Sequence, residues 1–323
     1  MKTNKPHILV ADWFAPDFAL EEAKLKPLGW TWSMPEWTPP APPREEQIKS
    51  LLARIKNSPR VDAVVFVLAP LPAQVIEALP PECRLLQRVG IGLDTLDLEC
   101  AQRRGIKVDN TPEYAIEEVA VHALGMMLSL HRQLAATQSV VLAGGWRAQS
   151  PEPIERLSTL TLGLLGLGRI GRRVAELCKP LFSRVIFHDP AVTTAPPGLE
   201  AVGIEALFQQ SDVLSLHCPL LPQTRDVINA KTLALMKPSA ILINVSRGGL
   251  VDAVALAEAL EAGRLAGAGL DVFEPEVLPA DSPLRKLGDK VILTSHTAWY
   301  SRQSVIDCRT QAIEKVINFL NQQ

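Results

Sequence analysis

The chain has 323 residues, which is enough for two domains of ordinary size and too many for one typical core. Hydrophobic residues make up 47% and charged residues 21% of the sequence, as in globular proteins, and no apolar run reaches the roughly 18 residues of a membrane span. A formal net charge of -2 leaves no basic surplus for phosphate backbones, so we expect neither nucleic acid nor a membrane as a partner.

The cysteines indicate a reducing compartment. They are odd in number and include no CxxC pair: Cys83, Cys100, Cys178, Cys218 and Cys308. Cys178 and Cys218 stand in apolar runs and are interpreted as small core residues, and none of the five is expected to be a thiol nucleophile. The polar N-terminus is unlike a signal peptide, and together these features predict a cytoplasmic protein.

The first third of the chain alternates apolar runs with segments of helical spacing. Four runs that end in Gly, Pro or polar clusters are predicted strands: residues 7–11, 61–68, 85–89 and 106–110. Two segments between them are predicted helices: residues 45–56 and 73–79. This alternation is typical of a parallel α/β domain.

A proline-rich segment at residues 34–43 interrupts this pattern. Five prolines surround Trp37, which predicts a stiff surface loop. A docking motif or an active-site lid is the alternative, because long loops often carry function.

A long helix is predicted over residues 112–134. One apolar stripe at helical spacing includes Val119 and Met126, and a second apolar face includes Ile116 and Leu124. We therefore expect both sides of the helix to be covered, at a domain junction or a subunit interface.

From residue 160 the alternation restarts. Six runs are predicted strands: residues 160–165, 184–188, 213–217, 240–244, 267–271 and 291–294. Helical segments lie between them, for example residues 252–263, and six strands with such crossovers describe a doubly wound dinucleotide fold. A last helix, residues 301–320, follows the final strand and is expected to return to the first domain.

A glycine-rich turn predicts the cofactor site. Gly166, Gly168 and Gly171 follow a predicted strand directly and open a helix, where free N–H groups and the helix dipole favour a pyrophosphate. Asp189 ends the next predicted strand, in the place of an acid that binds ribose hydroxyls. No arginine follows Asp189, and Arg184 points to the other face of its strand, so NAD is favoured over NADP.

Three residues after later strands fit a hydride-transfer site. Arg247 can clamp a carboxylate and polarise the adjacent carbonyl, and His296, paired with Glu276, can give a proton to a keto oxygen. Each also has a plain alternative, as a surface arginine, a solvated loop acid and a core histidine.

These motifs resemble the D-isomer-specific 2-hydroxyacid dehydrogenases over nearly the whole chain. The matching segments, in the family's order, are GLGRIG at 166–171, NVSRGGLVD at 244–252, GLDVFEPE at 269–276 and SHTAW at 295–299. The resemblance implies an NAD-dependent oxidoreductase that reduces a 2-keto acid or oxidises the matching D-2-hydroxy acid. It makes Arg247, Glu276 and His296 the catalytic residues.

The resemblance also implies the binding residues. Those expected along the cofactor, besides the three glycines and Asp189, are Arg169, Ile170, His217, Cys218, Pro219, Val245, Asp271 and His296. Those expected at the substrate are Arg247, Trp299 as an apolar wall, and Val89, Gly90 and Ile91, in a loop whose backbone N–H groups bind the carboxylate. No metal is expected.

Some positions depart from the family pattern. Val277 and Ser295 stand where proline is common, and Val121 stands where an acid is frequent, although no catalytic group is lost. The run HTAWYS at 296–301 looks most like the C-terminal-binding-protein branch, which leaves an NAD(H)-sensing corepressor with little turnover as an alternative function. A dehydrogenase for another acid, such as phosphite, is a second alternative.

The predicted fold is α/β with two doubly wound parallel-sheet domains. A Rossmann NAD-binding domain is expected over residues 114–296, and a smaller, discontinuous, flavodoxin-like substrate domain over residues 1–113 and 297–323, with the cofactor cleft between the domains. The resemblance further implies a homodimer.

Overall fold

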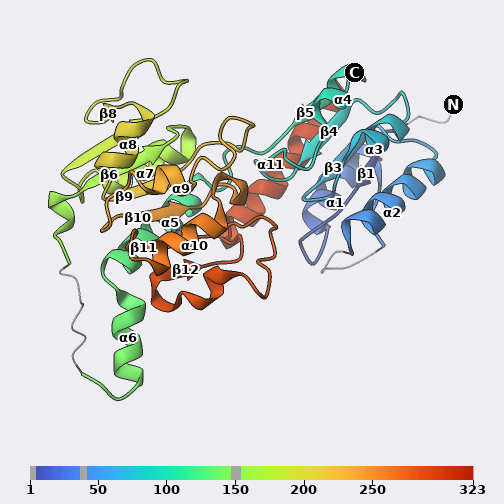
Figure 1. Cartoon of the computed structure of the whole chain (residues 1–323). Helices are drawn as coiled ribbons and strands as arrows, with labels where there is room; N and C mark the ends of the chain where they lie inside the picture. The colour runs from blue at the N-terminus through green and yellow to red at the C-terminus, as the bar shows by residue number, and fades with distance from the viewer. Residues whose placement is uncertain (1–4, 37–41, 147–153, 323) are drawn as a thin grey trace. The chain divides into compact units, whose positions relative to one another are not determined.

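The computed structural model describes residues 5–36, 42–146 and 154–322 (Figure 1). The chain divides into two compact units, one formed by Met1–Ala115 with Ser301–Gln323 and the other by Ile116–Tyr300. Each unit is built around its own parallel sheet, which confirms the predicted α/β class with two doubly wound sheets. Residues 37–41 of the proline-rich segment lie outside the described residues, so its role stays a prediction.

The first unit contains a five-stranded parallel sheet in the order β2-β1-β3-β4-β5, the flavodoxin-like arrangement. Its strands are β1 (His7–Val10), β2 (Thr31–Ser33), β3 (Ala63–Phe66), β4 (Leu85–Arg88) and β5 (Lys107–Asp109). The sequence predicted four of them. It missed β2, because this edge strand has only three residues and buries none of their side chains fully.

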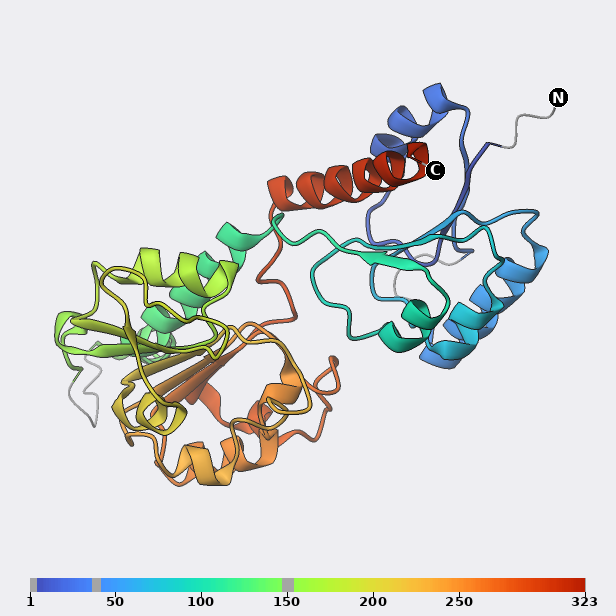
Figure 2. The ribbon, with the colours of Figure 1, turned by 90° about the horizontal axis from the view of Figure 1, so that it is seen from above.

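Helices cover both faces of this sheet (Figure 2). They are α1 (Ala19–Leu25), α2 (Arg44–Asn57), α3 (Ala73–Ala78), α4 (Leu98–Arg103) and α11 (Arg302–Asn321). The helices α2, α3 and α4 share one apolar cluster with Phe66 and Leu86 of the sheet. In a second cluster, Ile313 and Val316 of α11 meet Ile8, so the C-terminal helix packs on the first unit.

The second unit contains a seven-stranded parallel sheet in the order β12-β11-β10-β9-β6-β7-β8. Its strands are β6 (Thr161–Leu165), β7 (Arg184–His188), β8 (Glu200–Ala201), β9 (Val213–Leu216), β10 (Ile241–Asn244), β11 (Gly267–Leu270) and β12 (Val291–Leu293). This is the Rossmann strand order with one further strand at the edge. The six strands predicted from the sequence are present. The strand that the sequence did not predict is β8, which has two exposed residues.

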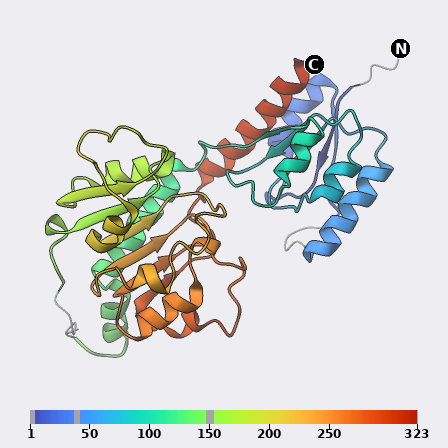
Figure 3. The same ribbon diagram turned by 45° about the horizontal axis from the view of Figure 1, so that its top comes forward.

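Helices also lie on both faces of the second sheet (Figure 2, Figure 3). They are α5 (Ile116–His131), α6 (Leu134–Leu142), α7 (Arg169–Cys178), α8 (Ile204–Gln210), α9 (Ala230–Leu233) and α10 (Ala253–Glu261). Phe208, Leu233 and Leu256 bring α8, α9 and α10 into one apolar core, while α5 packs beside α7 and against β10 and β11. Short 3-10 turns occupy Lys26–Leu28, Leu157–Thr159, Gly248–Leu250, Pro283–Lys286 and Gly288–Lys290.

The long predicted helix differs from expectation in one respect. It is divided into α5 and α6 at Gln133, whose φ is 51°. Both predicted apolar faces contain buried residues, Ala123 and Met126 on the first and Ala120 and Met127 on the second, while Val121, outside both faces, is 49% exposed. Helix α6 buries none of its residues and extends away from its own sheet (Figure 1). Within the described ranges, no helix is long and apolar enough to cross a membrane.

Candidate active site

The glycine-rich turn joins β6 to α7. Gly166 has a φ of 96°, and a Cβ there would stand 2.7 Å from the backbone N of Cys218 and from the carbonyl carbon of His217. A Cβ at Gly171 would stand 2.4 Å from the carbonyl oxygen of Gly166, so helix and turn require glycine at both places. A Cβ at Gly168, in contrast, would meet nothing within 4 Å.

The start of α7 fits a pyrophosphate. The N-cap residue is Gly168, which has no side chain to cap the first N–H groups of the helix, those of Arg169, Ile170 and Gly171. These groups and the positive end of the helix dipole favour an anion. The open space at Gly168 allows such a ligand to approach the backbone closely. The turn therefore fits the phosphates of a dinucleotide.

Asp189 is held against this turn. Its carboxylate accepts hydrogen bonds from the backbone N–H groups of Leu167, at 2.7 Å, and of Ala191, at 2.9 Å. Each oxygen keeps a lone pair that can accept a ribose hydroxyl. Arg184 lies at the other end of β7, where its guanidinium pairs with Glu200 at 2.8 Å, and it does not face Asp189 along the strand.

The segment after β9 packs directly against the glycine-rich turn. Nε2 of His217 lies 2.9 Å from Oγ of Ser215, while Nδ1 is buried and has no partner among the described residues. Burial lowers the pKa of His217 from 6.5 to about 4, so the ring is neutral at pH 7. Burial also raises the pKa of the Cys218 thiol to about 11, which removes it as a nucleophile. Pro219 is exposed.

The loop after β10 presents Arg247. Buried Asn244 shapes this loop, since its Nδ2 donates to the carbonyl oxygen of Arg247 at 2.8 Å and its Oδ1 accepts from the N–H of Ser246 at 3.0 Å. The Arg247 side chain is half-buried, and Val245 is buried. A Cβ at Gly248 would stand 2.0 Å from the carbonyl carbon of Phe273, so this loop packs directly on the loop after β11.

His296 and Glu276 form a pair. Nδ1 of His296 lies 3.0 Å from Oε2 of Glu276, and the two side chains are 33% and 53% exposed. His296 has a φ of 55°, which is unusual for a residue other than glycine. Its N–H donates to the backbone oxygen of Asp271 at 2.8 Å, and this bond holds the unusual conformation.

Asp271 organises the loop that carries His296. Its carboxylate, in a residue that is 1% exposed, accepts from the N–H groups of Thr297 and Ala298, both at 2.9 Å, and from the hydroxyl of Thr294. Nε2 of His122 on α5 lies 3.1 Å from the Thr294 hydroxyl oxygen. Sequence reasoning missed the parts played by His122, Thr294 and Asn244. Their polarity within apolar runs was the only signal, and it names no partner.

The arrangement brings three kinds of group to one edge of the sheet. The strands β10, β11 and β12 are neighbours and parallel, so the loops that follow them meet at their carboxyl ends. Arg247, Glu276 and His296 come from these three loops. A cation for a carboxylate and an ionisable pair for proton transfer are thus available where open α/β sheets bind ligands.

In the predicted substrate loop of the first unit, two backbone N–H groups are already hydrogen-bonded within the chain. The N–H of Val89 donates to the carbonyl oxygen of Phe66 at 2.8 Å, and the N–H of Gly90 donates to Oγ1 of Thr111 at 2.8 Å. Neither N–H is left for a ligand. The N–H groups of Ile91 and Gly92 donate to no other group of the described chain.

Trp299, in the second unit, is half-buried, and the ring of Tyr300 lies edge-on to it at a centroid distance of 5.6 Å.

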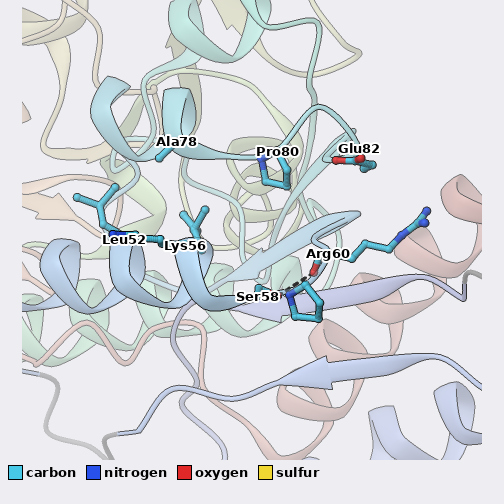
Figure 4. Close-up of a pocket in the computed structure, with 9 residues that line it drawn as sticks. Leu52, Lys56, Ser58, Arg60, Ala78, Pro80 and Glu82 are labelled. Atoms are coloured by element: carbon cyan, nitrogen blue, oxygen red, sulfur yellow. Dashed lines mark hydrogen bonds between the residues drawn. The ribbon is translucent and has the colours of Figure 1, made fainter.

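A cavity of about 470 Å³ also lies in the first unit (Figure 4). Leu52 and Lys56 of α2 face Ala78, the last residue of α3, and Pro80, which follows α3. The segments around Arg60 and Pro80 lead into β3 and β4, so the cavity is at the amino ends of the strands. Ligands of open α/β sheets bind at the carboxyl ends, and we therefore separate this cavity from the active site.

Comparison with known proteins agrees with this geometry. The family described as D-isomer specific 2-hydroxyacid dehydrogenase, NAD binding domain, matches residues 124–298. A glyoxylate reductase from Korarchaeum cryptofilum is 36% identical over 291 residues, which cover 88% of this chain and 85% of that protein. A hydroxypyruvate reductase from Thermotoga maritima is 37% identical over 269 residues, which cover 82% of this chain and 87% of that protein.

Solved structures agree as well. The D-lactate dehydrogenase of Aquifex aeolicus, complexed with NAD and lactic acid, superposes with a TM-score of 0.82 at 27% identity, over 98% of this chain and 96% of that chain. These three relatives are reductases and dehydrogenases. The predicted closeness of HTAWYS to the corepressor branch is therefore not supported.

Proposed function

Because the chain belongs to the family of D-isomer specific 2-hydroxyacid dehydrogenases, we propose that it reduces small 2-keto acids of the glyoxylate and hydroxypyruvate kind. Family membership makes it an NAD-dependent oxidoreductase that acts on a CH–OH group. The two reductase relatives favour the reductive direction and small substrates. The single observation that carries the proposal is the 3.0 Å pair of His296 and Glu276, because reduction of a keto group needs a positioned proton donor.

In the proposed mechanism, Arg247 binds the substrate carboxylate and polarises the adjacent carbonyl group. Glu276 accepts the Nδ1–H of His296, which orients the ring and leaves Nε2 to donate a proton to the keto oxygen. When it is bound, the reduced nicotinamide supplies the hydride that the carbonyl carbon accepts. In the oxidative direction, the neutral ring of His296 takes the proton from the hydroxyl group.

We assign the cofactor to the second unit and favour NAD over NADP. Asp189 accepts hydrogen bonds at the turn with both oxygens, so a 2′-phosphate would meet a negative charge there. The contact residues proposed beside the glycine turn and Asp189 are Arg169, Ile170, His217, Cys218, Pro219, Val245, Asp271 and His296.

For the substrate, we propose that the first unit contributes backbone N–H groups. The loop after β4 offers those of Ile91 and Gly92, because Val89 and Gly90 already donate within the unit. Trp299 is proposed as an apolar wall.

We also propose a homodimer in the cytoplasm. Helix α6 buries no side chain, and Leu134 and Val141 on it are 54% and 55% exposed. An apolar helix of this kind is stabilised when a second copy covers it.

The test is a panel of 2-keto acids with NADH, followed at the nicotinamide absorbance. Glyoxylate, hydroxypyruvate and pyruvate are expected to be reduced, with glyoxylate or hydroxypyruvate giving the highest kcat/KM. A panel in which pyruvate or a larger keto acid is preferred would contradict the substrate class. A protein that binds NADH but reduces no member of the panel would contradict the proposed function.

A further inference from the structure

Arg88 is a buried cation inside the loop that we assign to the substrate carboxylate. It is the last residue of β4 and is 8% exposed. Its Nε donates to the carbonyl oxygen of Gly92 at 2.9 Å, and its Nη1 donates to the carbonyl oxygen of Val89 at 2.8 Å. The side chain thus joins the two ends of the segment 89–92.

Thr111 fixes the centre of the same loop through two hydrogen bonds to Gly90. The hydroxyl oxygen of Thr111 accepts from the N–H of Gly90 at 2.8 Å, and the N–H of Thr111 donates to the carbonyl oxygen of Gly90 at 3.0 Å. Gly90 has a φ of 141°, and a Cβ there would stand 3.0 Å from Cζ of Arg88. The guanidinium therefore lies directly beneath Gly90, in space that a larger residue would take.

This arrangement determines which polar groups of the loop remain available to a ligand. Two carbonyl oxygens, those of Val89 and Gly92, turn inward to the guanidinium, and the N–H groups of Val89 and Gly90 are used by Phe66 and Thr111. The N–H groups that remain are consecutive, those of Ile91 and Gly92. Two consecutive N–H donors above a buried positive charge suit a carboxylate.

The surroundings keep Arg88 in place. Its Cζ lies 5.9 Å from the centre of the Phe66 ring, and the buried carboxylate of Asp12 is close enough to interact with its charge. Asp12 itself accepts from the N–H groups of the segment after β3, those of Val67, Leu68 and Ala69, at 2.6 to 2.9 Å. Both charged groups are therefore built into the carboxyl edge of this sheet.

We propose that Arg88 is a positioning residue for substrate binding. Its planar fork fixes the shape of residues 89–92 so that the N–H groups of Ile91 and Gly92 face the carboxylate, and its charge favours that anion. The inference rests on the proposed function, because it takes this loop as the carboxylate site. A lysine keeps the charge but cannot make both bonds in the plane of a guanidinium.

The test compares Arg88→Lys and Arg88→Met with the wild type. Arg103→Met is the matched control, because Arg103 lies on α4 of the same unit with a side chain that is 63% exposed. Calorimetry measures the affinity of the NADH-saturated protein for oxamate, an unreactive carboxylate analogue of a 2-keto acid. Both Arg88 variants are expected to bind oxamate about tenfold more weakly or worse, whereas Arg103→Met binds it like the wild type.

Two further readouts separate positioning from a general loss of structure. The affinity for NADH is expected to stay unchanged, because the cofactor turn is in the other unit. In turnover, KM for the keto acid is expected to rise while kcat is kept, because carboxylate contacts are the same in substrate and transition state. If Arg88→Met does not fold, Arg88→Lys decides.

Wild-type affinity for oxamate in the folded Arg88 variants would overturn the inference, and so would a fall in kcat with an unchanged KM. A wild-type protein that binds no oxamate would overturn it too, since the loop would then hold no carboxylate. Failure of the proposed function looks different: the wild type reduces no keto acid, and the oxamate affinities of the Arg88 variants still decide the role of this residue.

Discussion

Replacement of His217 by glutamine is expected to reduce the loss of unfolding free energy that occurs as the pH is lowered. Burial lowers the pKa of His217 in the folded protein from 6.5 to about 4. As the pH falls below 6.5, the unfolded chain therefore takes up a proton at this ring before the folded chain does. Stability from this group is complete above pH 6.5 and is lost as the pH falls toward 4.

The magnitude follows from the size of the shift. A lowering from 6.5 to about 4 corresponds to about 3.4 kcal/mol at 1.36 kcal/mol per unit, of which about 2.5 kcal/mol is lost between pH 7.5 and pH 4.5. Glutamine does not titrate in this range, and its amide can still bond to Oγ of Ser215. The drop between the two pH values should therefore be about 2.5 kcal/mol smaller in His217→Gln than in the wild type.

Urea titrations at pH 7.5 and 4.5, followed by circular dichroism, measure this difference. Ser215→Ala is the control, because it removes the 2.9 Å partner of the ring and keeps the titrating group, so the wild-type pH dependence should persist. Equal drops in the wild type and His217→Gln would refute the reasoning. In that case the buried ring either binds a proton in the folded state or reaches water.

The remaining predictions concern turnover, cofactor choice and assembly. His296→Asn should lower kcat/KM roughly 100- to 10,000-fold and leave NADH affinity unchanged, and retention of more than a tenth of the activity would show that another acid serves. Asp189→Ala should weaken NADH more than NADPH in fluorescence titrations, and equal wild-type affinities for both would refute the assignment. Leu134→Glu with Val141→Glu should turn the proposed dimer into a monomer of 35.2 kDa in light scattering, whereas Ile204→Glu, on exposed surface of α8, should not.

The fold could be predicted where strands are fully buried, because such strands have mostly apolar sequences. The strands β3, β4, β9 and β10 bury all their side chains, and most of these side chains are apolar. The edge strands β2 and β8 have three and two residues, and their pairing on one side only leaves no apolar signature. For α5, the periodicity predicted two covered apolar faces, and Met126 on one and Met127 on the other are buried.

The candidate site was predictable as residue types at strand ends, but not as a hydrogen-bonding network. Short motifs indicated Arg247, Glu276 and His296. The sequence does not show which N–H groups a fold consumes, and so the engagement of Val89 and Gly90 by Phe66 and Thr111 required the structure. Bonds of this kind join positions far apart in the chain, which no local pattern records.

The stereochemistry of the product tests the central claim most directly. Hydroxypyruvate and NADH are incubated with the protein, and the glycerate that forms is resolved on a chiral column. A D-isomer specific reductase that uses Arg247 and His296 as proposed should form D-glycerate alone, and His296→Asn should form almost none. L-glycerate, a racemic product, or the absence of product from a protein that binds NADH would contradict the account.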